Sequence, residues 1–444
     1  MNRRDLLTRC TIAVYGASLP IAKAHAQNRF APFRGQMLNI SIPIHPHYDA
    51  MIKLLPQFTE QTGIRVEIDR QPIPKMKERQ LGELSKPQGI YDLVCYVVMW
   101  KGEYVKKKLI REIEPYFRNA ALVDPAFDLQ DIAATYLENI GLVGGWRGYL
   151  NGPTAKLYGL PYGAETSILA YRKDIFERLK LSVPTSYYQL EQLLPEIRDK
   201  SGLGALSSRA QSGHQCVHAW LLHLNPMGGK VFDVNWAPRF NDRAGARALK
   251  FLQLVINTGP AGVVEFGQSE MTQAFLQGET AMYLDSTVVF GSVRDPLRSK
   301  VDGKVGYARH PKATAHASQS GGLGLAIPTN ARNADSAFLL MQWLTSKEQD
   351  RAVCRLGGGP TRTSTLMDEA LARQFPEYLT MRLQLRDADP DWRPIIPEWD
   401  EINTQVLGVA INRTLRGQTT AEEALNGIVP RVTEIMRRGG YLRG

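Results

Sequence analysis

Near its N-terminal end the chain switches between strand-like and helix-like hydrophobic patterns, and this order constrains the fold more than any other feature. Residues 38–44 and 64–68 alternate apolar and polar side chains, as half-buried strands do. Between them, residues 48–58 carry apolar side chains at helical spacing, and Gly63 supplies a stop signal. Residues 90–99 are apolar on both faces, a pattern typical of a buried parallel strand. The succession of strand, helix and strand predicts an α/β layered domain.

The length and charge of the chain narrow the possible classes of protein. Its 444 residues exceed what one domain usually needs, so two domains or lobes are expected. A net charge of +10 would suit a nucleic-acid-binding protein, but the densest basic run is only residues 106–108, and no recognition motif accompanies it. The charge therefore indicates a mildly basic, solvated surface, and no nucleic acid partner is expected.

The N-terminus has the three parts of a secretory signal peptide. Arg3 and Arg4 precede an apolar stretch over residues 11–22, and an A-x-A site follows that ends at Ala26. We expect residues 1–26 to be a signal peptide of the twin-arginine type, cleaved after Ala26. The apolar stretch is too short for a permanent membrane helix, and no later segment is apolar enough to be one. The mature protein is therefore expected to be soluble and periplasmic.

Cysteine and histidine residues give no sign of a metal or cofactor site. His214 and His218 lie one helical turn apart but lack the glutamate of an HExxH motif, and the glycines after residue 320 lack the spacing of a dinucleotide fingerprint. No metal and no cofactor are therefore expected. The mature chain has three cysteines without CxxC spacing, of which two could form a disulfide: Cys95, Cys216 and Cys354.

Four segments, in their order and spacing, carry a family resemblance. They are residues 91–94, 158–185, 274–282 and 321–362. Together they resemble the extracellular solute-binding proteins of ABC sugar importers, the maltose-binding-like group. Residues 163–166 and 396–399 are most similar to the branch that binds sugar alcohols and monosaccharides.

The resemblance implies an α/β fold of two lobes, the class II periplasmic binding protein fold, with hinge crossings near residues 161–170, 283–288 and 328–335. The first lobe would comprise residues 27–163 plus 286–330. The second would comprise residues 164–285 plus 331–444. Such lobes close around a ligand by hinge motion.

A sugar presents C–H faces that stack on aromatic rings and hydroxyl groups that bind polar side chains. Candidates are expected at strand ends and hinge crossings, where an open α/β sheet forms its crevice. Glycines there would let the backbone approach the ligand, and Arg362 would point into the cleft. The expected ligand-binding residues are His47, Tyr48, Trp100, Tyr162, Glu165, Asp285, Ser286, Gly321, Gly322, Arg362 and Trp399.

These features predict a monomeric, non-enzymatic substrate-binding component that captures a sugar or polyol and delivers it to the permease subunits of an ABC importer. The alternative is a periplasmic enzyme that acts on carbohydrate and is exported folded by the twin-arginine route. The sequence leaves open whether the ligand is a sugar, a polyol or a sugar acid.

Overall fold

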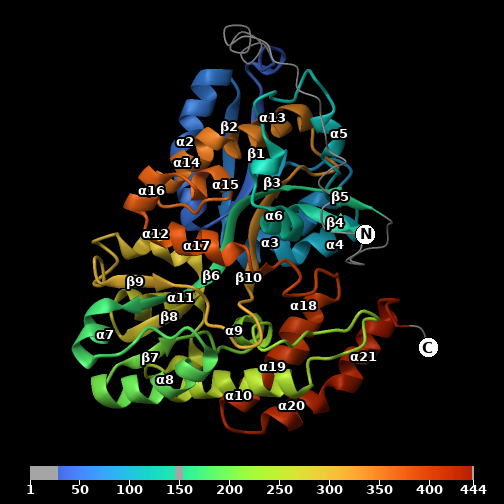
Figure 1. The fold of residues 1–444 in the computed structure, drawn as a ribbon. Coiled ribbons are helices and arrows are strands. Elements are labelled where there is room, and N and C mark those ends of the chain that lie inside the picture. Colours follow the sequence, from blue (N-terminus) through green and yellow to red (C-terminus); the bar gives the residue numbers. More distant parts are fainter. Residues whose placement is uncertain (1–28, 146–153, 443–444) are drawn as a thin grey trace.

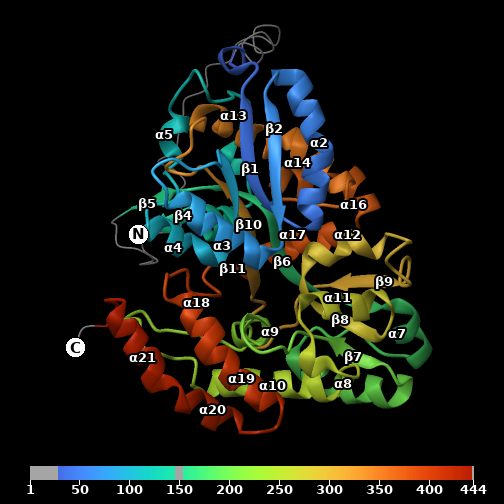
Figure 2. The same ribbon diagram turned by 180° about the vertical axis from the view of Figure 1, so that it is seen from behind.

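A computed structural model describes residues 29–145 and 154–442, and the expected signal peptide lies outside these ranges. One sheet runs through the whole molecule with strand order β2-β1-β3-β10-β6-β8-β7; β11 pairs with β10, and β9 pairs with β6. Figures 1 and 2 show two α/β lobes, one above the other, joined where β6 and β10 pass between them. None of the helices in the described ranges is long and apolar enough to cross a membrane.

Lobe 1 is built on the parallel strands predicted from the hydrophobic pattern. Strand β1 pairs in parallel with β2 on one side and β3 on the other. The strands of lobe 1 are β1 (Met37–Pro43), β2 (Arg65–Gln71) and β3 (Leu93–Val97). A small separate sheet of β4 (Leu142–Gly144) and β5 (Ala155–Leu157) lies beside them. The helices of lobe 1 are α2 (Pro46–Thr62), α3 (Ile73–Leu84), α4 (Lys101–Lys106), α5 (Glu114–Phe117), α6 (Ala134–Tyr136), α13 (Ala334–Leu344), α14 (Lys347–Arg355), α15 (Thr363–Leu366) and α16 (Glu369–Gln374).

Lobe 2 surrounds the other half of the sheet. Its strands are β7 (Gly204–Ser207), β8 (Thr280–Ser286) and β9 (Val305–Ala308). Its helices are α7 (Lys173–Leu179), α8 (Tyr187–Ser201), α9 (His214–Leu224), α10 (Arg243–Asn257), α11 (Gln268–Leu276), α18 (Trp399–Glu401), α19 (Gly408–Leu415), α20 (Ala421–Gly427) and α21 (Val429–Arg438). The cysteines of the described ranges are all buried and free, so none of them forms a disulfide.

Several helix boundaries follow from capping chemistry that the sequence already shows. Gly63 ends α2 in the left-handed conformation that glycine adopts without steric cost. Capping boxes begin α8 at Ser186 and α20 at Thr420. Pro430 lies in the first turn of α21, where its missing N–H is tolerated.

Two long strands connect the lobes: β6 (Leu160–Arg172) and β10 (Ser318–Ala326). They are antiparallel, and their register shifts between Gly322 and Gly324. Gly322 has φ +103°, and a Cβ there would lie 2.4 Å from the Gly163 carbonyl oxygen, so only glycine fits. The bulge bends the sheet at the junction of the lobes.

The observed packing corrects the expected lobe boundaries in three places. Strand β9 was assigned to lobe 1 but pairs with the lobe 2 end of β6. Helices α13 and α14 were assigned to lobe 2, yet they pack against α2 of lobe 1. The last crossing expected near 328–335 lies earlier, inside β10, because residues 323–326 already pair with β3.

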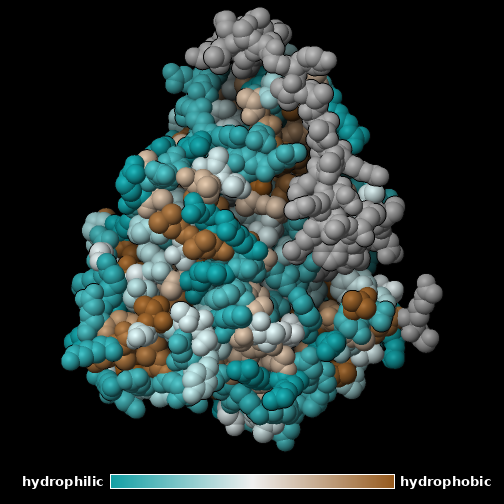
Figure 3. Space-filling model, in the orientation of Figure 1, coloured by the Kyte–Doolittle hydropathy of each residue, from teal (hydrophilic) through white to brown (hydrophobic). Residues whose placement is uncertain are grey.

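The chain crosses between the lobes again after α16, through α17 (Glu377–Leu385) and β11 (Ala388–Asp389). Helix α17 packs against β6, β9 and β10, and its Glu377 forms an ion pair with Arg294, just after α12 (Phe290–Val293). Leu379 and Leu383 of α17 are exposed. Figure 3 shows a hydrophilic surface with brown patches, one of which lies where Figure 1 draws α12 and α17.

A buried hydrogen-bonded chain ties α8 and α9 to strand β6. The Tyr187 hydroxyl lies 2.9 Å from Nδ1 of His223 on α9 and 3.0 Å from Nε2 of His310. Nδ1 of His310 is 3.1 Å from the hydroxyl of Ser167 on β6. These polar groups satisfy one another inside an apolar core, as buried polar groups must.

This chain predicts a loss of stability in acid. Burial lowers the pKa of both imidazoles from 6.5 to about 3, whereas in the unfolded chain they titrate at the ordinary value. Their contribution to folding is therefore complete above pH 6.5 and is lost as the pH falls toward about 3. Replacing His310→Gln should reduce the slope of unfolding free energy against pH by about 1.4 kcal/mol per unit in this window. Urea titrations across the window measure it, and an unchanged slope would contradict the assignment.

Candidate functional site

Three of the expected ligand-binding residues meet where β6 and β8 pass the junction. Glu165 lies on β6, and Asp285 and Ser286 end β8. Ser286 pairs in register with Ser167, and its hydroxyl donates a hydrogen bond to the Glu165 carboxylate. The backbone of Gly321 on β10 pairs directly with Glu165. The junction therefore presents a carboxylate beside a point of β10 that carries no side chain, Gly321.

Asp285 forms a buried ion pair with Arg209, which follows β7. Nε of Arg209 donates to Oδ2 of Asp285 at 2.9 Å, and Nη2 donates to Oδ1, so the pair is bidentate. Both side chains are fully buried. Burial would raise the pKa of Asp285, but Arg209 and His218 outweigh it and hold that pKa well below its usual range.

His218 on α9 connects this pair to a second cation, Arg393. Nη2 of Arg393 lies 3.2 Å from Nδ1 of His218, and Nε2 of His218 lies 3.3 Å from Oδ1 of Asp285. A guanidinium only donates, so Nδ1 accepts, and the proton of the neutral ring must be on Nε2, facing Asp285. Burial lowers the pKa of His218 to about 4, which keeps the ring neutral. His214, one turn earlier, lies 3.1 Å from the Asn403 amide through its Nδ1.

Arg393 links the two lobes. Its guanidinium carbon lies 3.9 Å from the ring centroid of Trp392, a cation–π contact. On the lobe 1 side, its Nη1 lies 3.6 Å from Sδ of Met99, just beyond β3. Burial lowers the pKa of Arg393 to about 9, and Glu165 opposes this effect, so the group stays charged at neutral pH. An arginine that contacts both lobes is placed to respond to their closure.

On the lobe 1 side, His47, Tyr48 and Tyr162 form an aromatic cluster against β6. The rings of His47 and Tyr162 meet edge to face at 4.3 Å, and the Tyr48 hydroxyl donates to the Tyr162 carbonyl oxygen at 3.2 Å. The backbone N–H of Gly359 donates to Nδ1 of His47 at 3.2 Å, so the proton of this ring is on Nε2. The structure thus brings together the residues expected at the first strand end and the first crossing.

Several buried polar atoms around the junction have no hydrogen-bond partner among the described residues. A buried polar group left without a partner costs about 1–3 kcal/mol, so a molecule that supplies donors and acceptors would gain by binding them. A hydroxyl group can do both. The atoms are His47 Nε2, Tyr136 Oη, Asn139 Oδ1, Tyr162 Oη and Gln319 Oε1.

Trp100 and Trp399 are both buried in the structure. Trp100 packs against Tyr104 with ring centroids 6.2 Å apart, and Nζ of Lys77 lies 5.8 Å from its ring. Trp399 is fully buried on α18, which packs against the turn that contains Trp100. The indole N–H of Trp399 lacks a hydrogen-bond partner among the described residues. Both rings lie beside the junction, with their faces packed against protein.

The structure places Arg362 away from this cluster, in contrast to the expectation that it points into the cleft. Its side chain is fully buried in lobe 1. Nε donates to the Thr345 carbonyl at 2.7 Å, and Nη1 donates to the Asp128 carbonyl at 2.7 Å and to Asp131 at 3.2 Å. The hydrogen bonds of Arg362 therefore hold the loop after α14 against the rest of lobe 1.

Arg209, His218, Trp392 and Arg393 were not predicted as part of the site. His214 and His218 lie at helical spacing without the glutamate of an HExxH motif, and this pattern gives no sign of a contact with Asp285 or Arg393. Trp392-Arg393 lies in an irregular loop, where no periodic signal exists. The contact of Arg393 with His218 joins segments that are 175 positions apart, and the Trp392 ring also meets His218 edge to face at 5.3 Å.

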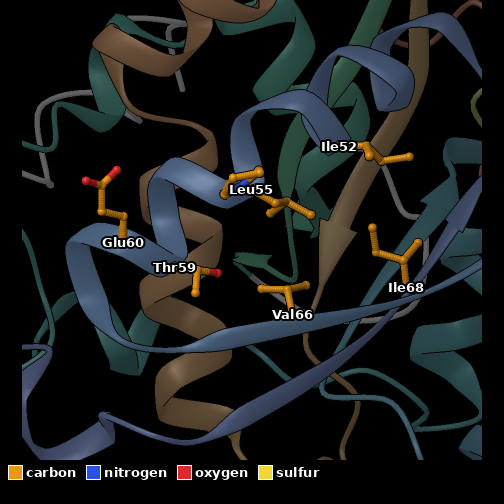
Figure 4. A pocket seen from close by; sticks show the side chains of 7 residues that line it. Ile52, Leu55, Thr59, Glu60, Val66 and Ile68 are labelled. Atoms are coloured by element: carbon orange, nitrogen blue, oxygen red, sulfur yellow. The ribbon is translucent and has the colours of Figure 1, made fainter.

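A hollow of about 530 Å³ lies elsewhere on lobe 1, between α2 and β2. Figure 4 shows Ile52 and Leu55 of the helix facing Val66 and Ile68 of the strand, with Glu60 pointing away. None of the candidate site residues lines it. Its apolar lining does not suit a ligand rich in hydroxyl groups.

The chain matches the family model of bacterial extracellular solute-binding proteins over residues 44–351. It is 25% identical to a probable amino-acid ABC transporter periplasmic-binding protein of Sinorhizobium fredii, over 98% of this chain and 100% of that protein. It is 30% identical to a mannitol-binding protein of Pseudomonas aeruginosa, over 64% of this chain and 70% of that protein.

Solved structures show the same fold. An ABC transporter solute-binding protein from Agrobacterium radiobacter K84, in complex with ribitol, superposes with a TM-score of 0.80 at 24% identity, covering 90% of this chain and 99% of that one. The two-lobed α/β architecture and the match over most of the chain agree with each other. The protein belongs to the family of bacterial extracellular solute-binding proteins.

Proposed function

We propose that this protein is the periplasmic substrate-binding component of an ABC importer and captures a polyol or sugar between its two lobes. The observation that carries the proposal is the group of buried polar atoms without partners at the junction of the lobes. A polyhydroxy compound supplies both donors and acceptors to such atoms. Members of this family are binding proteins, and we propose that this chain likewise catalyses no reaction.

The mannitol-binding relative and the ribitol complex support a polyol in particular. The Sinorhizobium fredii relative, described as a probable amino-acid transporter protein, makes amino acids the second candidate class. An amino acid needs one partner for its ammonium and one for its carboxylate. At this junction Asp285 already binds Arg209, which favours the neutral polyol.

The remaining parts of the proposal concern export and partners. We propose that residues 1–26 direct the chain to the periplasm, where it acts as a monomer. After closure around the ligand, both lobes would present a surface that the permease subunits recognise. The basic N-terminal arginines and the A-x-A site support export.

A thermal-shift panel with the mature chain tests the ligand class. A ligand that binds only the folded state stabilises it by about 2.7 kcal/mol at 100 times its Kd. For a protein of this size we expect mannitol, ribitol or a related compound to raise Tm by about 3 °C.

The panel should contain polyols, monosaccharides, disaccharides, sugar acids and amino acids. A shift with an amino acid and with no polyhydroxy compound would overturn the polyol assignment. Conversion of a sugar into product by the purified chain would instead support the alternative function, that of an enzyme that acts on carbohydrate.

A further inference from the structure

Building on the proposed function, we propose that Glu165 makes the binding site selective for uncharged polyhydroxy compounds and excludes their carboxylate-bearing counterparts, such as aldonates. The chain has a net charge of +10, which alone would suggest an affinity for anions. The contacts at the junction indicate the opposite. The cations there already bind protein groups, whereas the half-buried carboxylate of Glu165 has one oxygen available to accept further hydrogen bonds.

Two of the three cations near the junction are fully engaged by the protein. Arg209 uses two nitrogens on Asp285, and its Nη1 lies 3.4 Å from Oε1 of Gln215. Lys101 is completely buried, and its Nζ donates to the carbonyl oxygens of Asn139 and Leu142, both at 2.6 Å. A ligand carboxylate would have to break these contacts to bind either cation.

The third cation, Arg393, is held between protein groups on several sides. Trp392 covers one face of its guanidinium, His218 accepts from Nη2, and Met99 lies against Nη1. The neutral ring of His218 lies between Arg393 and Asp285, so the guanidinium is connected through it to the buried carboxylate. Arg393 thus supports the site without offering a bidentate edge to a ligand anion.

Glu165 differs from these groups. Its carboxylate is half-buried, and one oxygen, Oε2, accepts from the Ser286 hydroxyl. Burial raises the pKa of Glu165 above its ordinary value, and the bond from Ser286 and the nearby Arg209 oppose this rise in part. A carboxylate can accept about four hydrogen bonds, so this one has capacity for ligand hydroxyls.

Gly321 and Gly322 of β10 lie next to this carboxylate. A Cβ at Gly322 would lie 3.1 Å from Cγ of Glu165. A Cβ at Gly321 would lie 3.7 Å from the Trp392 indole nitrogen and 3.8 Å from Oδ1 of Asn139. Gly322 is packed against the β6 backbone, whereas Gly321, which pairs in register with Glu165, leaves side-chain cover open toward the Trp392 indole and Asn139. A hydroxyl placed there donates to Glu165, whereas a carboxylate placed there is repelled by it.

Mannitol and mannonate form the test pair, because they differ only in a terminal alcohol and a terminal carboxylate. Isothermal titration should show that wild-type protein binds mannonate about 100-fold more weakly than mannitol. In Glu165→Gln, which has nearly the same shape, mannitol affinity should fall about tenfold, and the mannonate-to-mannitol ratio of Kd should shrink about tenfold or more. Asp174→Asn removes an exposed carboxylate on α7 and is the matched control, for which the ratio should not change.

Equal binding of the two compounds by wild-type protein would overturn the selectivity and leave the proposed function standing. An unchanged ratio in Glu165→Gln would overturn the role of Glu165. Binding of neither compound would overturn the polyol assignment itself, and the selectivity with it. The mannonate-to-mannitol ratio of Kd in wild-type protein can overturn the selectivity alone. The proposal therefore stays testable even if the Glu165→Gln variant does not fold.

Discussion

Asp285→Ala should lower the free energy of unfolding by about 3–5 kcal/mol, because it leaves Arg209 as a buried charge without its partner. The ion pair is bidentate and completely buried, so bulk water does not solvate the Arg209 guanidinium. His218 would also lose the carboxylate that lies 3.3 Å from its Nε2. Urea titration followed by tryptophan fluorescence measures the change.

An exposed pair with the same geometry provides the control. Arg172 donates to Asp174 through Nε at 2.8 Å and also through Nη2, but the Asp174 side chain is 43% exposed. Asp174→Ala should therefore cost less than about 1 kcal/mol. Replacing both Arg209 and Asp285 by leucine should recover part of the loss, because a buried apolar pair carries no desolvation penalty. Equal costs for the two alanine variants would contradict the role assigned to burial.

Arg362→Ala should also destabilise the protein by about 3–5 kcal/mol, but without weakening ligand binding. Its guanidinium satisfies the carbonyl oxygens of Thr345 and Asp128 and lies 4.9 Å from the Phe127 ring centroid. Removing it leaves buried carbonyls without donors, and each costs about 1–3 kcal/mol.

Two measurements separate this structural role from the ligand contact that the sequence suggested. Denaturant titration should show the loss of stability, and calorimetry with the best polyol should give a Kd within about twofold of wild type. Arg431→Ala, which removes an arginine from exposed ion pairs, should change neither quantity appreciably. A large rise in Kd for Arg362→Ala would place this residue in the binding site after all.

The local elements of the fold could be predicted because their signals are short-range. Apolar side chains at spacings of two and of three to four residues identify β1, α2 and β2. Capping residues such as Ser186 and Thr420 identify helix starts. The lobe assignment of α13 and α14 depends on which apolar face packs against α2, and no local pattern encodes that choice.

The site could be predicted only in part, for a similar reason. Glu165, Asp285 and Ser286 lie on crossing strands, which a family resemblance can locate. Arg209 and Arg393 come from loops, and their roles depend on contacts between distant segments. Arg362 follows a glycine-rich turn that suggests an exposed loop, yet its side chain is buried by Asp128 and Thr345 from elsewhere in lobe 1.

The most direct test of the central claim is calorimetric titration of the mature chain with mannitol and ribitol, followed by chromatographic recovery of the compound. We expect saturable binding of one molecule per chain, with the compound recovered unchanged. Absence of binding by any polyol or sugar, or recovery of a chemically altered product, would contradict the account.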